Sequence, residues 1–120
     1  NAFIVHSEDG MDEISPFAKT KIIELNEGNI KNFMIDPADL DITNKNKENL
    51  KGKNSEYNAQ KIIDIYKGEG NEFSDAVSLN VAAGLNVSGK EKDFKKAYEQ
   101  AKHHLKSGKV FKHLQKIQAI

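Results

Sequence analysis

Four carboxylates lie close together near the amino terminus of this chain, in residues 3–15. A short apolar run ends there at Val5, and a histidine, a glycine and two serines accompany the carboxylates that follow. Asp12 and Glu13 are neighbours, so both could ligate one hard cation such as Mg²⁺, which prefers carboxylate oxygens and water. The alternative is an acidic surface loop without a ligand, because charged residues mostly lie on protein surfaces.

The other polar residues of this segment have no single role. His6 could hydrogen-bond within a site, but a structural role in orienting the loop is the favoured interpretation, because a pKa near neutrality assigns no function by itself. Glu8 and Asp9 either cap the loop or are solvated.

Four polar residues farther along the chain are interpreted as structural or solvated. Asn80 lies in an apolar helical stretch, and a buried amide needs partners, so it is expected to tie a loop or helix end to the core. His103 and His104 are adjacent and therefore point in different directions on a helix. His113 could approach them only across the turn at Gly108. These histidines are expected on a solvated surface.

The composition excludes several classes of function. The chain has 120 residues, which fits one domain, with 18 lysines, no arginine, 18 acidic residues and a net charge of zero. A general nucleic-acid binder normally carries a basic excess, so the net charge of zero argues against that class. The absence of cysteine is compatible with a cytosolic protein without disulfides. No apolar run reaches the length of a membrane span. The chain begins at Asn1 rather than methionine, which predicts a fragment or a processed chain.

Three strands are predicted to position the acidic residues. The apolar run at residues 3–5 is too short for a helix and predicts a fully buried strand, beyond whose carboxyl end a ligand would bind in a parallel sheet. Residues 19–25 and 30–35 predict a hairpin, since Gly28 can adopt positive φ in the tight connection. Together they indicate a mixed sheet with an antiparallel edge.

The rest of the chain is predicted to be mostly helical. A capped turn is expected at residues 36–40. The lysine- and asparagine-rich stretch at 43–54 has almost no apolar residues and predicts a solvated loop. A phosphate-binding role for its lysines is disfavoured, because the stretch lacks a glycine-rich nest for phosphate. Apolar periodicity predicts four helices, of which the second is apolar nearly all round and therefore expected to be buried. The predicted helices span residues 55–66, 71–88, 94–105 and 110–117. The chain is thus one unit with a strand, acidic loop and hairpin (1–42), a polar loop (43–54) and a helical part (55–120).

The pattern His-x-x-Asp-Gly-x-Asp-Glu-x-Ser at residues 6–15 resembles the acidic loop of the anthranilate phosphoribosyltransferase family. That family usually has glycine where this chain has Ser7. The resemblance continues through Asn58-Ala59, through Asp75-Ala76-Val77-x-Leu79-Asn80-x-Ala82-Ala83, and through Ser107-Gly108. It covers essentially the whole chain, but only about the last third of such an enzyme.

The resemblance implies the carboxyl-terminal portion of a nucleoside phosphorylase/phosphoribosyltransferase-type α/β domain: a buried strand and an antiparallel hairpin covered by about four helices. It implies transfer of phosphoribosyl from phosphoribosyl pyrophosphate (PRPP) to anthranilate in tryptophan biosynthesis, by a cytoplasmic enzyme that is a homodimer when complete. Asp12 and Glu13 would then hold Mg²⁺. No catalytic or substrate-binding residue is assigned. The family's Gly-Thr-Gly-Gly-Asp and Lys-His-Gly-Asn motifs do not occur in this sequence, so the chain alone is expected to be inactive.

Three alternatives remain open from the residues. One is a fragment of a related pyrimidine nucleoside phosphorylase, and another is a non-enzymatic remnant or interaction module of the same fold. A weak nucleic-acid binder using residues 102–116 is a third, which the neutral net charge disfavours. A fragment with incomplete sheet and exposed apolar faces is also expected to self-associate.

Overall fold

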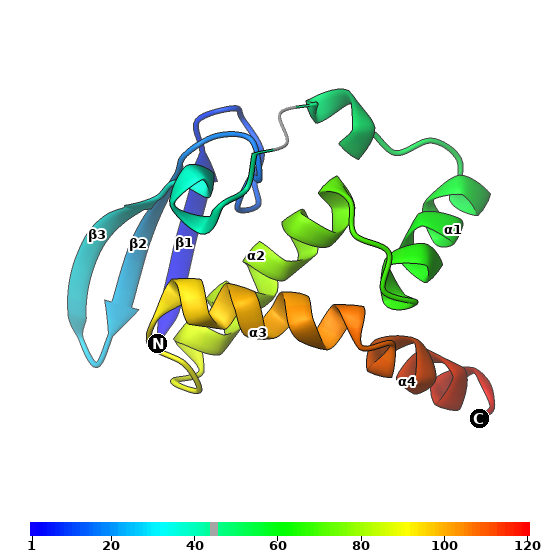
Figure 1. Cartoon of the computed structure of the whole chain (residues 1–120). Helices are drawn as coiled ribbons and strands as arrows, with labels where there is room; N and C mark the ends of the chain where they lie inside the picture. Colours follow the sequence, from blue (N-terminus) through cyan, green and yellow to red (C-terminus); the bar gives the residue numbers. More distant parts are fainter. Residues whose placement is uncertain (44–45) are drawn as a thin grey trace.

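The computed structural model describes residues 1–43 and 46–120, and in these residues a three-stranded sheet precedes four α-helices (Figure 1). The strands form an antiparallel meander in the order β1-β2-β3. Their bounds are Ala2–Ser7 for β1, Thr20–Asn26 for β2 and Asn29–Ile35 for β3. Val5 pairs with Ile22, which in turn pairs with Phe33, so these three side chains share the inner face of the sheet. The predicted hairpin is confirmed, with Gly28 at φ 82°.

The prediction of a fully buried first strand is wrong for this structure. β1 lies at an edge of a sheet that is antiparallel throughout, not mixed, and its Ile4 side chain is 67% exposed. Successive side chains alternate between the two faces of a strand, and an antiparallel sheet can be covered on one face only. Phe3 and Val5 therefore pack against the core while Ile4 faces outward.

Short turns connect the sheet to the helices. The 3₁₀ helix η1 (Pro37–Leu40) begins at Asp36, whose Oδ1 accepts from the Ala38 N–H at 3.0 Å, as the predicted capped turn requires. A second 3₁₀ helix, η2 (Lys47–Leu50), lies within the stretch predicted as a loop. Positions 44 and 45 of that stretch lie outside the described residues.

The helices begin and end close to the predicted positions. Side-chain caps set three of the starts, because Asn54, Asn71 and Asp93 each accept a backbone N–H of the first turn. The fourth helix follows Gly108, which separates it from the third and has a left-handed φ of 71° that glycine adopts without strain. The bounds are α1 (Ser55–Tyr66), α2 (Glu72–Val87), α3 (Phe94–Lys106) and α4 (Lys109–Gln118).

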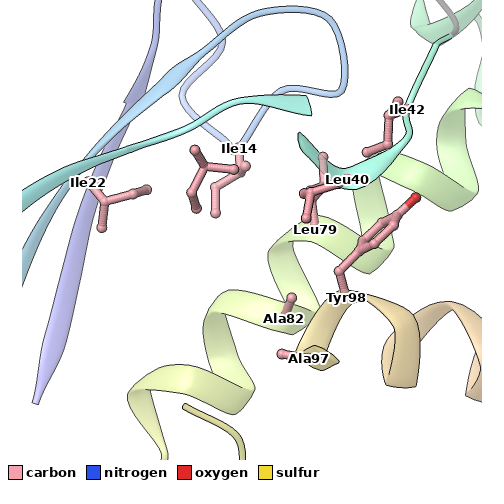
Figure 2. Close-up of a cluster of buried hydrophobic side chains, with 9 residues drawn as sticks. Ile14, Ile22, Leu40, Ile42, Leu79, Ala82, Ala97 and Tyr98 are labelled. Carbon is pink, nitrogen blue, oxygen red and sulfur yellow. The ribbon is translucent and has the colours of Figure 1, made fainter. Parts of the chain in front are cut away.

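The core lies between the inner face of the sheet and helices α2 and α3 (Figure 2). Ile14, Ile22 and Leu79 are fully buried there. Since α2 faces the sheet on one side and α3 on another, Val81 on its remaining side is 46% exposed, and the prediction that this helix is buried all round is wrong. The α/β class is confirmed, but α1 and α4 contribute no residue to this core and lie away from the sheet (Figure 1). None of the described helices is long and apolar enough to span a membrane.

Candidate functional site

The acidic loop, defined here as residues 8–15, leaves β1 through a tight turn. The Gly10 N–H donates to the Ser7 carbonyl at 3.0 Å, and Gly10 has φ +85°, a conformation that other residues adopt at a cost. Ser7 is fully buried, and its hydroxyl donates to the Lys19 carbonyl at 3.4 Å. Among the described non-glycine residues, positive φ occurs only at Glu27 and Asp41, so Ser7 adopts its place without left-handed strain.

Asp9 is the hydrogen-bonding centre of the loop. Its Oδ1 accepts from the Met11 N–H at 3.2 Å, and its Oδ2 accepts from the Ser15 hydroxyl at 2.9 Å. The Lys47 ammonium lies 3.3 Å from Oδ2 and donates to the Asp9 carbonyl at 2.8 Å. Burial alone would raise the pKa of Asp9, but the nearby Ser7 hydroxyl and the contacts with Met11, Ser15 and Lys47 outweigh burial and hold this pKa below its usual value. Of the two alternatives for Asp9, loop capping is correct.

Asn80 holds the other end of the acidic loop. Its Oδ1 accepts from the Ile14 N–H at 3.1 Å, and its Nδ2 donates to the Ile14 carbonyl at 3.2 Å and to the Ala76 carbonyl at 2.8 Å. The prediction that Asn80 ties a loop to the core is confirmed. Ser15 follows, with its N–H donating to the Thr20 hydroxyl at 3.2 Å, which anchors the return to β2.

Asp12 and Glu13 lie between these anchors and are both exposed. Within residues 1–43 and 46–120, neither carboxylate accepts a hydrogen bond or joins an ion pair. Glu13 borders a shallow hollow of about 420 Å³ that Phe73 and Asn80 also line. The described residues contain no group of three or more side chains suited to a metal ion. Two free carboxylates nevertheless fit Mg²⁺, which usually keeps several waters and binds one or two protein carboxylates together with substrate phosphates.

The remaining candidates stay outside this arrangement. His6 lies exposed on β1, paired with Lys21, and Glu8 is exposed. His103, His104 and His113 are exposed on α3 and α4, as predicted. The contact that the sequence missed is Lys47, which comes from the lysine-rich stretch and reaches Asp9 across 38 residues. No local pattern distinguishes it from the other lysines of that stretch.

A second polar cluster fixes α2, the helix that carries Asn80. The Tyr98 hydroxyl donates to Asp75 Oδ1 at 2.9 Å, and the Lys102 ammonium lies 3.0 Å from the same oxygen and 3.1 Å from the Tyr98 hydroxyl. Burial is the largest cause that raises the pKa of Tyr98 to about 12; the Asp75 carboxylate also raises this pKa, while the hydrogen bond with Lys102 lowers it. The cluster joins α2 to α3 and so holds Asn80 on a rigid element.

Comparison with known proteins identifies the family. Residues 1–111 match the glycosyl transferase family, a/b domain. The chain belongs to this family. It is 50% identical over 119 residues to the anthranilate phosphoribosyltransferase of Pelagibacter ubique, and the alignment covers 99% of this chain and 36% of that enzyme. It is 41% identical over 116 residues to the enzyme of the same name from Caldanaerobacter subterraneus, covering 97% of this chain and 34% of the relative.

Solved structures show the same fold. The crystal structure of anthranilate phosphoribosyltransferase from Thermus thermophilus matches with a TM-score of 0.84 at 28% identity, over 96% of this chain and 34% of that one. The Saccharomyces cerevisiae enzyme in complex with PRPP and Mg matches with a TM-score of 0.80 at 22% identity, over 94% of this chain and 33% of that one. The predicted resemblance is confirmed, and the chain spans 34–36% of the length of the two curated relatives described above.

Proposed function

We propose that this chain is the carboxyl-terminal part of an anthranilate phosphoribosyltransferase of tryptophan biosynthesis, and that it supplies the carboxylates of a Mg²⁺ site. The observation that carries the proposal is the pair Asp12 and Glu13, exposed and without protein partners among the described residues, on a loop anchored at both ends. The 50% identity to the Pelagibacter ubique enzyme supports it.

The chemistry requires stabilisation of a leaving group. The anthranilate amino nitrogen attacks C1 of PRPP and releases a proton, the bond from C1 to the pyrophosphate oxygen breaks, and negative charge develops on the departing pyrophosphate. A Mg²⁺ ion held by Asp12 and Glu13 would supply electrostatic stabilisation of that charge. In this proposal the two carboxylates bind the ion, and Asp9 and Asn80 keep the loop in place.

The complete enzyme would hold the remaining substrate-binding groups. The glycine-rich and Lys-His-Gly-Asn motifs of the family are not in this sequence, so we expect the chain alone not to turn over PRPP and anthranilate. A cytoplasmic location and a homodimeric complete enzyme belong to the same proposal.

A chimera tests the function. This chain replaces the aligned 119-residue segment of the Pelagibacter ubique enzyme, and consumption of anthranilate is followed by its fluorescence with PRPP and Mg²⁺ present. We expect turnover, and we expect Asp12→Asn and Glu13→Gln to increase the Mg²⁺ concentration needed for half-maximal rate. Glu8→Gln is the matched control, because Glu8 is an exposed carboxylate of the same loop.

Two outcomes would contradict the proposal. A folded chimera without transferase activity would favour the non-enzymatic remnant. A chimera that instead cleaves pyrimidine nucleosides with phosphate would favour the nucleoside phosphorylase.

A further inference from the structure

The Asn80 amide is matched to the backbone of Ile14. The Asn80 side chain hydrogen-bonds to both backbone groups of Ile14: Oδ1 accepts from the N–H at 3.1 Å, and Nδ2 donates to the carbonyl at 3.2 Å. The third bond, from Nδ2 to the Ala76 carbonyl at 2.8 Å, decides the orientation of the amide, because the NH₂ group must face two carbonyls. An aspartate could not donate these bonds, and an apolar residue could make none of them.

This match constrains Glu13, the preceding residue. The Ile14 N–H belongs to the planar peptide that joins Glu13 to Ile14, so its bond to Asn80 sets the orientation of that plane. The Ile14 side chain is fully buried against the core, which removes its remaining freedom. The backbone of Glu13 is therefore held in place at its carbonyl end, while its side chain remains exposed.

The other end of the segment is fixed at Asp9. Lys47 contacts both the carboxylate and the carbonyl of Asp9, at 3.3 and 2.8 Å. The Ser15 hydroxyl joins the same carboxylate at 2.9 Å, which closes the loop on itself. Residues 10–13, with the two candidate metal ligands, thus run between two anchored residues, Asp9 and Ile14.

We propose that Asn80 and Lys47 are positioning residues for the metal site, and that the affinity of Asp12 and Glu13 for a divalent cation depends on them although neither is a ligand. This inference rests on the proposed function. An anchored loop loses less conformational entropy on binding an ion than a free one. Residues that orient metal ligands from behind typically change metal affinity by roughly 10- to 100-fold when replaced.

Replacement of Lys47 distinguishes a positioning role from a purely electrostatic effect on cation binding. Removing a cation beside an acidic loop should tighten binding of a divalent cation if electrostatic repulsion alone operates. Loss of an anchor should weaken binding. The two effects have opposite signs, so the direction of the change for Lys47→Gln decides between them.

The test measures the binding of Mn²⁺ alone to the chimera. Binding is detected as the loss of the free-ion signal in electron paramagnetic resonance. Mn²⁺ replaces Mg²⁺ because both prefer carboxylate and water oxygens. We expect Asn80→Ala to raise the dissociation constant about 10-fold or more, and Lys47→Gln to raise it by a smaller factor. Asn58→Ala is the matched control, because Asn58 holds the backbone of Lys53 in the same two-sided way, away from the acidic loop.

The outcomes distinguish this inference from the proposed function. If Asp12→Asn and Glu13→Gln weaken Mn²⁺ binding while Asn80→Ala and Lys47→Gln leave it unchanged or tighter, positioning is wrong and the metal site stands. If the unmodified chimera does not bind Mn²⁺, or the carboxylate variants bind it normally, both fail. Should Asn80→Ala fail to fold, which its thermal unfolding would show, the sign of the Lys47→Gln effect decides by itself.

Discussion

The acidic loop and the lysine-rich stretch are both held by the side-chain amide of a helix asparagine. Asn80 on α2 binds the N–H and carbonyl of Ile14, and Asn58 on α1 binds those of Lys53, at 2.9 Å for the N–H and 3.4 Å for the carbonyl. Ile14 is fully buried, whereas Asn58 and Lys53 are exposed. The same pair of hydrogen bonds should therefore contribute more to stability at Ile14 than at Lys53, because water competes only with the pair at the exposed Lys53.

The largest effect is expected for Asn80→Ala. The substitution leaves a backbone N–H and a carbonyl of a buried residue without partners, and each unsatisfied buried group costs about 1–3 kcal/mol. We expect the free energy of unfolding to fall by roughly 3 kcal/mol, measured by urea denaturation at pH 7. Protection of the Ile14 amide from hydrogen exchange should fall as well. A loss below about 1 kcal/mol would show that water satisfies the freed groups, and the contrast with Asn58 would disappear.

Asp9→Asn is expected to have the next largest effect, of about 1–2 kcal/mol at pH 7, since charged hydrogen bonds are stronger than neutral ones. The pKa of Asp9 is lowered in the folded chain. Its carboxylate therefore contributes stability above the pKa of the unfolded state, and this contribution is lost as the pH falls through the lowered value. Urea denaturation of both proteins from pH 7 down to pH 3 should show the difference narrowing. A difference that stays constant over this range would contradict the ionic role of Asp9.

A smaller effect is expected for Asn58→Ala. Lys53 loses the same two bonds that Ile14 loses in Asn80→Ala, but water replaces them at this exposed position. We expect a loss of about 0.5 kcal/mol or less in the same denaturation experiment. A loss equal to that of Asn80→Ala would mean that burial does not explain the difference between the two regions.

The smallest effect is expected for Lys51→Gln, which removes the ion pair with Glu48 at 2.7 Å in the lysine-rich stretch. The two side chains are 70% and 72% exposed, and such pairs contribute between zero and about 1 kcal/mol. We expect a change within about 0.5 kcal/mol that vanishes at high salt. Lys47→Gln serves as the comparison, since its partner carboxylate is only 15% exposed.

The local elements could be predicted from the sequence alone. Apolar periodicity placed three helix starts within a residue of the positions that the caps Asn54, Asn71 and Asp93 define. Both signals are local, since a capping bond joins groups only two or three residues apart. The hairpin at Gly28 follows from the same short range. The pair of carboxylates at Asp12 and Glu13 could also be recognised from the sequence, because the two residues are neighbours in the chain whatever the fold.

The tertiary structure decided what surrounds those carboxylates. Asn80 meets Ile14 across 66 residues, and Lys47 meets Asp9 across 38, distances over which no helical or strand period relates one residue to another. The burial of β1 on one face likewise depends on where α2 and α3 pack. The sequence by itself determined which residues could bind a cation, and the packing of α2 beneath the sheet decided how their loop is held.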